Sequence, residues 1–197
     1  MELKAVANTR GAKAIREAMQ ALLWERSYED ITVSDIIVRS TYSKSCFYQN
    51  YCDKLDVVEQ IMQEEAFLYV QELISGMNHY MGITDEIKYN YHISLKTFQY
   101  IKNKQKFYSM LFDEKIPTMG LDYFCDLAIK NFKQMEKFQI NSDCPKEELD
   151  FFEYCNTNLV LRYIQFWKLH DFQETPEQMA NHVAALCRLS KPGGVYC

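Results

Sequence analysis

Apolar residues recur every three or four positions along most of this chain, which is the spacing of one face of an α-helix. Between residues 8 and 26 one such stripe consists of Ile15, Ala18, Met19, Leu22 and Leu23. Glycine and proline, which punctuate β-rich folds, number only 6 and 4 among 197 residues. The chain is therefore expected to be all-α, with about nine helices, and a turn-dense β architecture is excluded.

Helix starts are marked by side chains that accept hydrogen bonds from free backbone N–H groups. Thr32, Ser43 and Asp53 occupy such positions. Thr175 precedes Pro176, a residue favoured in the first helical turn. Combined with the apolar spacing, these signals predict helices at 8–26, 33–40, 44–51, 54 to the region of Gly76, 84–102, 118–138, 146–170 and 175–190, with a short helix through Phe107, Met110 and Leu111.

Charge is spread unevenly along the chain, whose formal net charge is −5. Residues 1–54 carry 8 Lys and Arg against 7 Asp and Glu, whereas residues 55–197 carry 14 against 20. Only the first segment can approach a polyanion without net repulsion. Its charge is too small to indicate nucleic-acid binding by itself, so such a prediction must rest on local geometry.

Several function classes lack their characteristic residues. The seven cysteines form no Cys-x-x-Cys pair and the four histidines lack metal-ligand spacing, so neither a disulfide framework nor a metal site is predicted. No Gly-rich phosphate loop, catalytic carboxylate pair or nucleophile elbow is found, and we expect no enzyme and no cofactor. No apolar run reaches the roughly 20 residues of a membrane span, and the first residues lack a signal-peptide core. We therefore expect a cytoplasmic protein without a membrane contact.

Two short predicted helices, at 33–40 and 44–51, are joined by about three residues, which is the layout of a helix-turn-helix. Polar side chains lie away from the expected buried face of Phe47 and Tyr51; they are Ser43, Lys44, Ser45, Tyr48 and Gln49. Hydroxyl and ammonium groups can bind phosphates, and a Gln amide can pair with an adenine edge. The starts of the second and fourth helices offer further N–H groups to phosphate. An ordinary surface helix fits the same pattern, so both interpretations stay open.

The most specific pattern is an ordered set of motifs between about residues 10 and 60. It consists of Ile15–Leu23, Tyr28, Ile31–Ile36, Ser43–Tyr51 and Asp53-Lys54. In this order the chain resembles the N-terminal domain of TetR-family transcriptional regulators. The resemblance implies a helix-turn-helix DNA-binding domain at 1–54 and a larger helical ligand-binding and dimerisation domain at 55–197. The DNA-binding residues that it implies are Thr32, Tyr42, Ser43, Lys44, Ser45, Tyr48, Gln49, Asn50 and Lys54, of which Tyr48 and Lys54 hold the phosphate backbone.

Three positions depart from the usual family pattern. Ser27 stands where a Gly commonly follows the first helix, Ser40-Thr41 replaces an Ala-Gly turn, and Ile37 replaces a smaller Ala. A non-Gly residue in a left-handed turn conformation costs about 1–2 kcal/mol. We therefore expect a strained turn that can tilt the following helix and weaken operator affinity.

Most of the aromatic residues lie after residue 54, where packing in the core is their ordinary role. The resemblance implies that some of them surround an effector pocket formed by the middle helices. The candidate ligand-binding residues are Tyr100, Phe107, Tyr108, Tyr154, Asn158 and Arg162. Arg162 fits either a contact with an anionic or carbonyl ligand or an exposed, ion-paired position.

The last two long predicted helices carry apolar stripes. The first stripe is Leu149, Phe152, Leu159, Tyr163 and Phe166, and the second is Met179, Val183, Leu186 and Leu189. The resemblance implies that these helices pair with their symmetry mates in a homodimer, although the same stripes would serve an internal core. The segment from 154 to 183 is also similar to a C-terminal domain found among Firmicutes members.

The hypothesis from the sequence is a homodimeric, ligand-responsive repressor whose partners are a near-palindromic operator in double-stranded DNA and a small-molecule effector. The alternative is a regulator-like co-regulator or small-molecule carrier that acts through a protein partner without reading DNA. The near-neutral charge of residues 1–54 favours this alternative. Cys46 and Cys52 lie on or just after the third helix, so their oxidation would disturb DNA contact, whereas inert thiols are the ordinary expectation.

Overall fold

The computed structural model describes residues 9–113, 120–135 and 146–189. Within these ranges the chain forms only helices, which confirms the all-α prediction. They are α1 (Arg10–Glu25), α2 (Val33–Ser40), α3 (Lys44–Asn50), α4 (Lys54–Tyr80), α5 (Glu86–Asn103), α6 (Gln105–Phe112), α7 (Leu121–Gln134), α8 (Lys146–Leu169) and α9 (Pro176–Leu189). Most boundaries agree with the expected ones to about two residues, and both ends of the helix expected at 118–138 lie outside the described residues. No helix in the described part of the chain is long and apolar enough to cross a bilayer.

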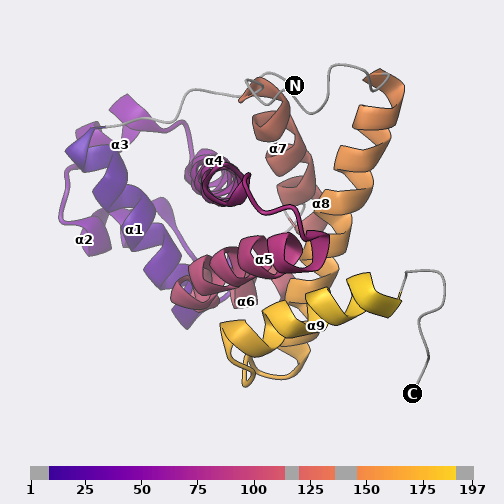
Figure 1. Ribbon diagram of the computed structural model, residues 1–197. Helices are drawn as coiled ribbons and strands as arrows, with labels where there is room; N and C mark the ends of the chain where they lie inside the picture. The colour runs from indigo at the N-terminus through magenta and orange to yellow at the C-terminus, as the bar shows by residue number, and fades with distance from the viewer. Residues whose placement is uncertain (1–8, 114–119, 136–145, 190–197) are drawn as a thin grey trace.

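Helices α1, α2 and α3 form a small unit, and its α1 packs against α4 (Figure 1). Ile15, Ile36 and Phe47 are fully buried in the centre of this unit. Tyr51 is also buried, but it ends α3 as an extended C-cap residue instead of continuing the helix. The apolar spacing therefore predicted the buried face of α3 correctly.

Helix α4 is the longest helix and connects this unit to the remaining helices. Figure 1 shows α1, α2 and α3 on one side of α4, and α7 and α8 on the other side. Helices α5 and α7 pack along α4, α8 packs against α7, and α9 packs along α5. Large aromatic side chains fill this second core; among the fully buried ones are Phe98, Tyr108, Phe124 and Trp167.

A buried guanidinium group joins three of these helices. Arg16 of α1 is only 2% exposed, and its Nη1 donates to the hydroxyl of Tyr51 at 2.9 Å. That hydroxyl in turn donates to the carbonyl oxygen of Ala12 at 2.9 Å, and Arg16 Nε donates to Glu64 Oε2 on α4 at 2.8 Å. Burial raises the pKa of Tyr51, so its hydroxyl keeps the proton that it donates. The end of α3 and the wall of α4 are therefore both held to α1.

The turn between α2 and α3 has the left-handed backbone that its sequence predicted. Thr41 adopts φ 62° and ψ 13° at the end of α2. The hydroxyl of Ser40 supports this turn, because it donates to the carbonyl of Ile37 at 3.1 Å and accepts the N–H of Tyr42 at 3.4 Å. The structure thus accommodates a β-branched residue where glycine would be free of strain.

Thr41→Gly is expected to stabilise the protein by about 1 kcal/mol, because the relief of left-handed strain exceeds the flexibility that glycine adds to the unfolded chain. Urea unfolding followed by circular dichroism measures the change. Thr41→Ala is the matched control and should stay within about 0.5 kcal/mol of the wild type, since it keeps a side chain on the strained backbone. A glycine variant no more stable than the alanine variant would contradict the strain argument.

A buried carboxylate links α4 to α5 and α6. The side chain of Glu65 is 7% exposed and forms an ion pair with Lys104. Its Oε1 accepts hydrogen bonds from the hydroxyls of Tyr100 at 2.8 Å and Tyr108 at 3.3 Å. Burial raises the pKa of Glu65 above its ordinary 4.5, although Lys104 and the two hydroxyls act in the opposite direction. Desolvation of the charge is thus the dominant influence on this group.

The pKa of Glu65 is higher in the folded state than in the unfolded chain. Glu65 therefore stabilises the folded protein fully below pH 4.5, and this contribution to the free energy of unfolding is lost as the pH rises through the raised pKa. The free energy of unfolding of the wild type minus that of Glu65→Gln should therefore fall as the pH rises from about 4.5 toward and beyond neutrality. Urea unfolding of both proteins across this range measures the difference. Glu147→Gln removes an exposed carboxyl group from α8 and is the matched control. A constant difference between wild type and Glu65→Gln would show that Glu65 does not titrate as described.

Candidate functional site

The outer face of the α2–α3 turn and of α3 is polar and accessible. Phe47 points into the core and its ring meets that of Tyr48 edge to face, with centroids 5.2 Å apart. The exposed residues, which we call the α3 face, are Tyr42, Ser43, Lys44, Ser45, Tyr48 and Gln49. The Ser43 hydroxyl accepts the N–H of Cys46 at 3.1 Å, so it starts α3 as the sequence predicted. The α3 face therefore combines hydroxyls, one ammonium group and one amide on an anchored helix.

Two other residues that the sequence singled out form bonds within the α1–α3 unit or to its loop. Lys54 Nζ donates to the carbonyls of Tyr28 and Ile31, both at 2.8 Å, and lies 4.2 Å from the centre of the Tyr28 ring. Asn50 donates to the Cys46 carbonyl at 2.7 Å and accepts from Thr9 at 3.0 Å. These bonds fix the α1–α2 loop and the end of α3 beside the α3 face.

Carboxylates occupy the starts of α2 and α4. Thr32 and Asp35 form a capping box, in which Asp35 accepts the Thr32 N–H at 2.8 Å and the Thr32 hydroxyl at 2.7 Å. These two bonds, with a smaller effect of Arg26, lower the pKa of Asp35 to about 2. Asp53 accepts the N–H of Asp56 at the start of α4. At both helix starts a side-chain oxygen therefore already accepts one of the N–H groups that the sequence analysis offered to phosphate.

Close packing between α1 and α3 depends on a glycine that the sequence analysis did not single out. A Cβ atom on Gly11 would lie 2.5 Å from Cys46 Sγ and 3.3 Å from the ring of Tyr42. Any larger residue would push α3 away from α1. Its signal in the sequence was an isolated glycine within a helical stretch, a pattern that marks close packing. Cys46 is half-buried at this contact, whereas Cys52 is exposed.

The predicted ligand-binding residues separate into two groups. Tyr100 and Tyr108 meet at Glu65, and Phe107 lies edge to face with Tyr108 at 5.4 Å. The three residues from α8 lie elsewhere: Tyr154 and Arg162 are exposed, and Asn158 donates to the Tyr154 carbonyl at 2.8 Å. Arg162 donates to Gln165 on its own helix at 2.7 Å, which matches the exposed position considered for it.

The stripes predicted on α8 and α9 do not mark one buried face each. The buried residues of α8 include Leu161, Ile164 and Trp167, whereas Leu159 is 49% exposed and Phe166 is 45% exposed. On α9, Met179 is buried against the core but Leu186 is 48% exposed. The side chains of Leu149, Phe152 and Leu189 lie outside the described residues. Members of both predicted stripes are therefore exposed, and on α8 other apolar residues supply the buried side of the helix.

Within the described part of the chain, no three His, Cys, Asp or Glu side chains gather as a metal site. Cys125 is buried, and burial raises the pKa of its thiol to about 12. This cysteine is therefore protonated at neutral pH and behaves as an apolar residue.

A family model described as the C-terminal region of a transcriptional regulator, of the TetR group, matches residues 90–188. No curated protein sequence matches the chain. Several solved structures are similar. The fatty acid degradation regulator FadR from Bacillus halodurans is 15% identical, with a TM-score of 0.65 over 96% of this chain and 100% of that chain. A TetR-family transcriptional regulator from Syntrophomonas wolfei is 16% identical, with a TM-score of 0.64 over 93% of this chain and 95% of that chain.

The dihydroxyacetone kinase operon activator DhaS is 17% identical, with a TM-score of 0.56 over 90% of this chain and 93% of that chain. At such identities the solved structures establish the fold, and the family model adds a sequence match over half of the chain. The three-helix unit, the long α4 and the helices after it agree with both findings. The chain belongs to the TetR family of transcriptional regulators.

Proposed function

We propose that this protein is a ligand-responsive transcriptional repressor that binds a near-palindromic operator as a homodimer. The observation that carries the proposal is the α3 face, a group of exposed polar side chains on a short helix anchored by Phe47. In this proposal residues 1–54 bind DNA, and residues 55–197 bind the effector and the second protomer. DhaS, whose fold is similar, is an operon activator, so activation is the alternative to repression. A reporter gene placed behind the operator tells whether this protein lowers or raises transcription.

The side chains of the α3 face have distinct proposed roles in the major groove. Lys44 and the hydroxyl of Tyr48 bind phosphates, with Tyr42, Ser43 and Ser45 beside them, while Gln49 reads an adenine edge. We assign Thr32, Asn50 and Lys54 to the border of the interface, where their present bonds position the neighbouring loops. Arg26 and Arg39 pair with Asp35 and Glu25, so much of the positive charge in this unit is already compensated. Affinity should therefore depend strongly on the few groups of the α3 face.

Exposed apolar side chains on the last two helices support the homodimer. On α8, Phe151 and Leu169 are each 71% exposed and Tyr154 is 59% exposed, in addition to Leu159 and Phe166. Positions 151, 155, 159, 166 and 169 follow helical spacing, so they lie on one face of α8, which the charged residue Arg162 interrupts. A largely apolar exposed face of this kind is typical of a protein interface. Pairing across a two-fold axis would give the dimer two copies of α3 for two half-sites.

The effector region is proposed around Glu65, where Tyr100 and Tyr108 converge beside Phe107. A ligand that displaces either hydroxyl would change how α5 and α6 hold α4, and α4 carries Glu64, the partner of Arg16. The ligand would thereby favour one arrangement of the two α3 helices over another. Tyr154, Asn158 and Arg162 lie apart from Glu65 and remain proposed as separate effector contacts on α8. Titration of a compound into the operator complex, with fluorescence anisotropy as the signal, tests this coupling.

Lys44→Gln and Tyr48→Phe are expected to weaken operator binding about fivefold to tenfold each, because each removes one phosphate contact per half-site. Lys44→Gln should also make the affinity less dependent on salt, since fewer counterions are released. Fluorescence anisotropy with the DNA that flanks the gene itself, measured at several salt concentrations, gives both quantities.

Lys88→Gln removes an exposed charge from α5 and is the matched control for Lys44→Gln. It should leave both the affinity and its salt dependence unchanged. If the wild type shows no competition-resistant binding, or if binding does not respond to salt, the DNA proposal fails and the protein-partner alternative is favoured.

Leu159→Glu is expected to convert the dimer to monomers, because it places a charge in the centre of the apolar face of α8. Light scattering coupled to size exclusion should then give a mass near 23.4 kDa, against twice that value for the wild type. Gln71→Glu adds the same charge to an exposed position of α4 and should leave the dimer intact. A wild type that is monomeric at micromolar concentration would contradict the proposed assembly.

A further inference from the structure

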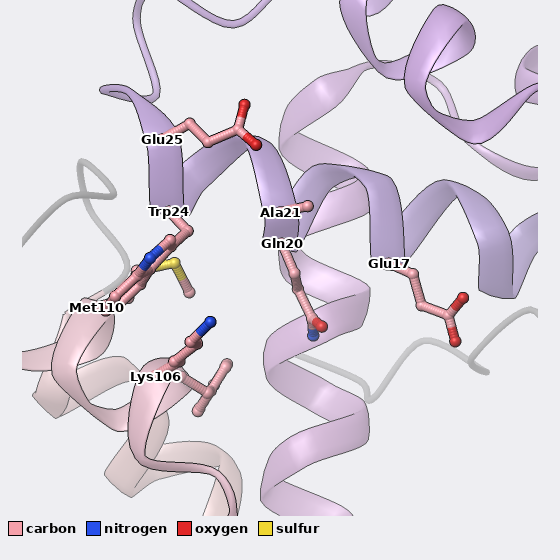
Figure 2. A pocket seen from close by; sticks show the side chains of 8 residues that line it. Glu17, Gln20, Ala21, Trp24, Glu25, Lys106 and Met110 are labelled. Atoms are coloured by element: carbon pink, nitrogen blue, oxygen red, sulfur yellow. The ribbon is translucent and has the colours of Figure 1, made fainter.

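A pocket of about 380 Å³ opens between α1 and α6, apart from the Glu65 region (Figure 2). Its apolar wall consists of Trp24 and Ala21 from α1 together with Phe107 and Met110 from α6. Trp24 is 45% exposed, which is unusual for the largest side chain in a helix that otherwise buries its apolar face. The pocket therefore offers an accessible indole ring beside an apolar surface.

The Trp24 ring already interacts with a cation. Lys106 Nζ lies 5.4 Å from the centre of the ring, and the Lys106 side chain is exposed on α6. Such a contact contributes only about 0.5–1 kcal/mol at an exposed site. Lys106 can therefore swing into solvent at little cost, and a ligand cation can take its place over the ring.

The edge of the pocket favours positive charge. Glu17, Gln20 and Glu25 line it from α1, and they supply two carboxylates and one amide oxygen (Figure 2). Helical spacing puts Glu17, Gln20 and Trp24 on one side of α1, facing α6. Both carboxylates have exposed ion pairs, Glu17 with Lys13 at 3.9 Å and Glu25 with Arg39 at 2.7 Å, and exposed pairs of this kind contribute little free energy. A cation in the pocket would therefore still meet acceptors together with the face of an indole ring.

Glu25 also connects this pocket to α2. Its two carboxylate oxygens accept hydrogen bonds from Arg39 at 2.9 and 2.7 Å, and Arg39 lies in the last turn of α2. A cation that approaches Glu25 competes with this pair. The pocket thus lies between α1 and α6 and is linked through Glu25 to α2, and both α1 and α2 belong to the unit that carries the α3 face.

We propose that this pocket is a small-molecule site for a planar aromatic compound with one positive charge. The aromatic ring stacks on Trp24 between Phe107 and Met110, and the charge takes the place of Lys106 on the side of α1 where Glu17 and Gln20 lie (Figure 2). This site shares Phe107 with the proposed effector region but opens between α1 and α6, away from Glu65. Its binding can be measured on the protein without DNA, so a failure here is distinguishable from a failure of the proposed operator binding.

N-methylquinolinium chloride is a suitable probe, because it has two fused rings and one fixed positive charge. The chain has two tryptophans, Trp24 in the pocket and Trp167 fully buried, so two indole N–H cross-peaks are expected in a nitrogen–proton correlation spectrum. The Trp24 peak should shift saturably below about 1 mM probe, as expected for a ligand of this size, while the Trp167 peak stays in place. Trp24→Phe assigns the peaks.

Matched variants and a matched ligand sharpen the test. Glu17→Gln should weaken binding about threefold to tenfold, and Lys106→Gln should strengthen it by a similar factor, because each changes one charge beside the ligand. Glu147→Gln on α8 should have no effect. 1-Naphthoate has the same ring size with a negative charge and should give no saturable shift. A linear shift of Trp24, equal movement of both peaks, or equal binding of naphthoate would overturn the proposal.

Discussion

The buried hydrogen bonds of Arg16 determine how the proposed DNA-binding unit sits on the rest of the protein. A guanidinium group cannot lose its charge in a protein, so burial at 2% exposure requires partners on every side that it faces. Tyr51 and Glu64 are the partners of its Nη1 and Nε atoms, from the end of α3 and from α4. Because the Tyr51 hydroxyl also donates to Ala12, the position of α3 relative to α1 is set by directional bonds in addition to apolar packing.

Helix α4 carries adjacent carboxylates that serve the two halves of the molecule. Glu64 bonds to Arg16 in the three-helix unit. Glu65 instead bonds to Tyr100 of α5, to Tyr108 of α6 and to Lys104, which lies between these two helices. Neighbouring residues on a helix point about 100° apart, so one turn of α4 can contact both groups of helices. A ligand that alters the hydrogen bonds of Glu65 therefore acts on the residue next to Glu64, whose bond to Arg16 helps to hold the unit that carries the α3 face. This proximity is a physical basis for the proposed coupling between effector and DNA.

Local signals predicted much of the fold and part of the candidate site. Thr32, Ser43 and Asp53 begin their helices as expected, because each bond joins groups only two or three residues apart. The left-handed turn at Thr41 was expected from the family resemblance, because Ser40-Thr41 stands where the family commonly has Ala-Gly. The faces of α8 were not, since Leu159 and Trp167 are both apolar and spacing alone does not say which one is buried against α5 and which one meets solvent.

The sequence by itself determined the helices, their starts and the buried face of α3, because hydrogen bonds and apolar spacing within one helix are local properties. Only the tertiary structure decided that Lys54 bonds to the α1–α2 loop, that Glu65 is enclosed by two tyrosines, and that Trp24 faces Lys106 across a pocket. Each of these contacts joins residues more than twenty positions apart. They depend on how helices pack against one another, and that packing is set by the shape and burial of all the helices together.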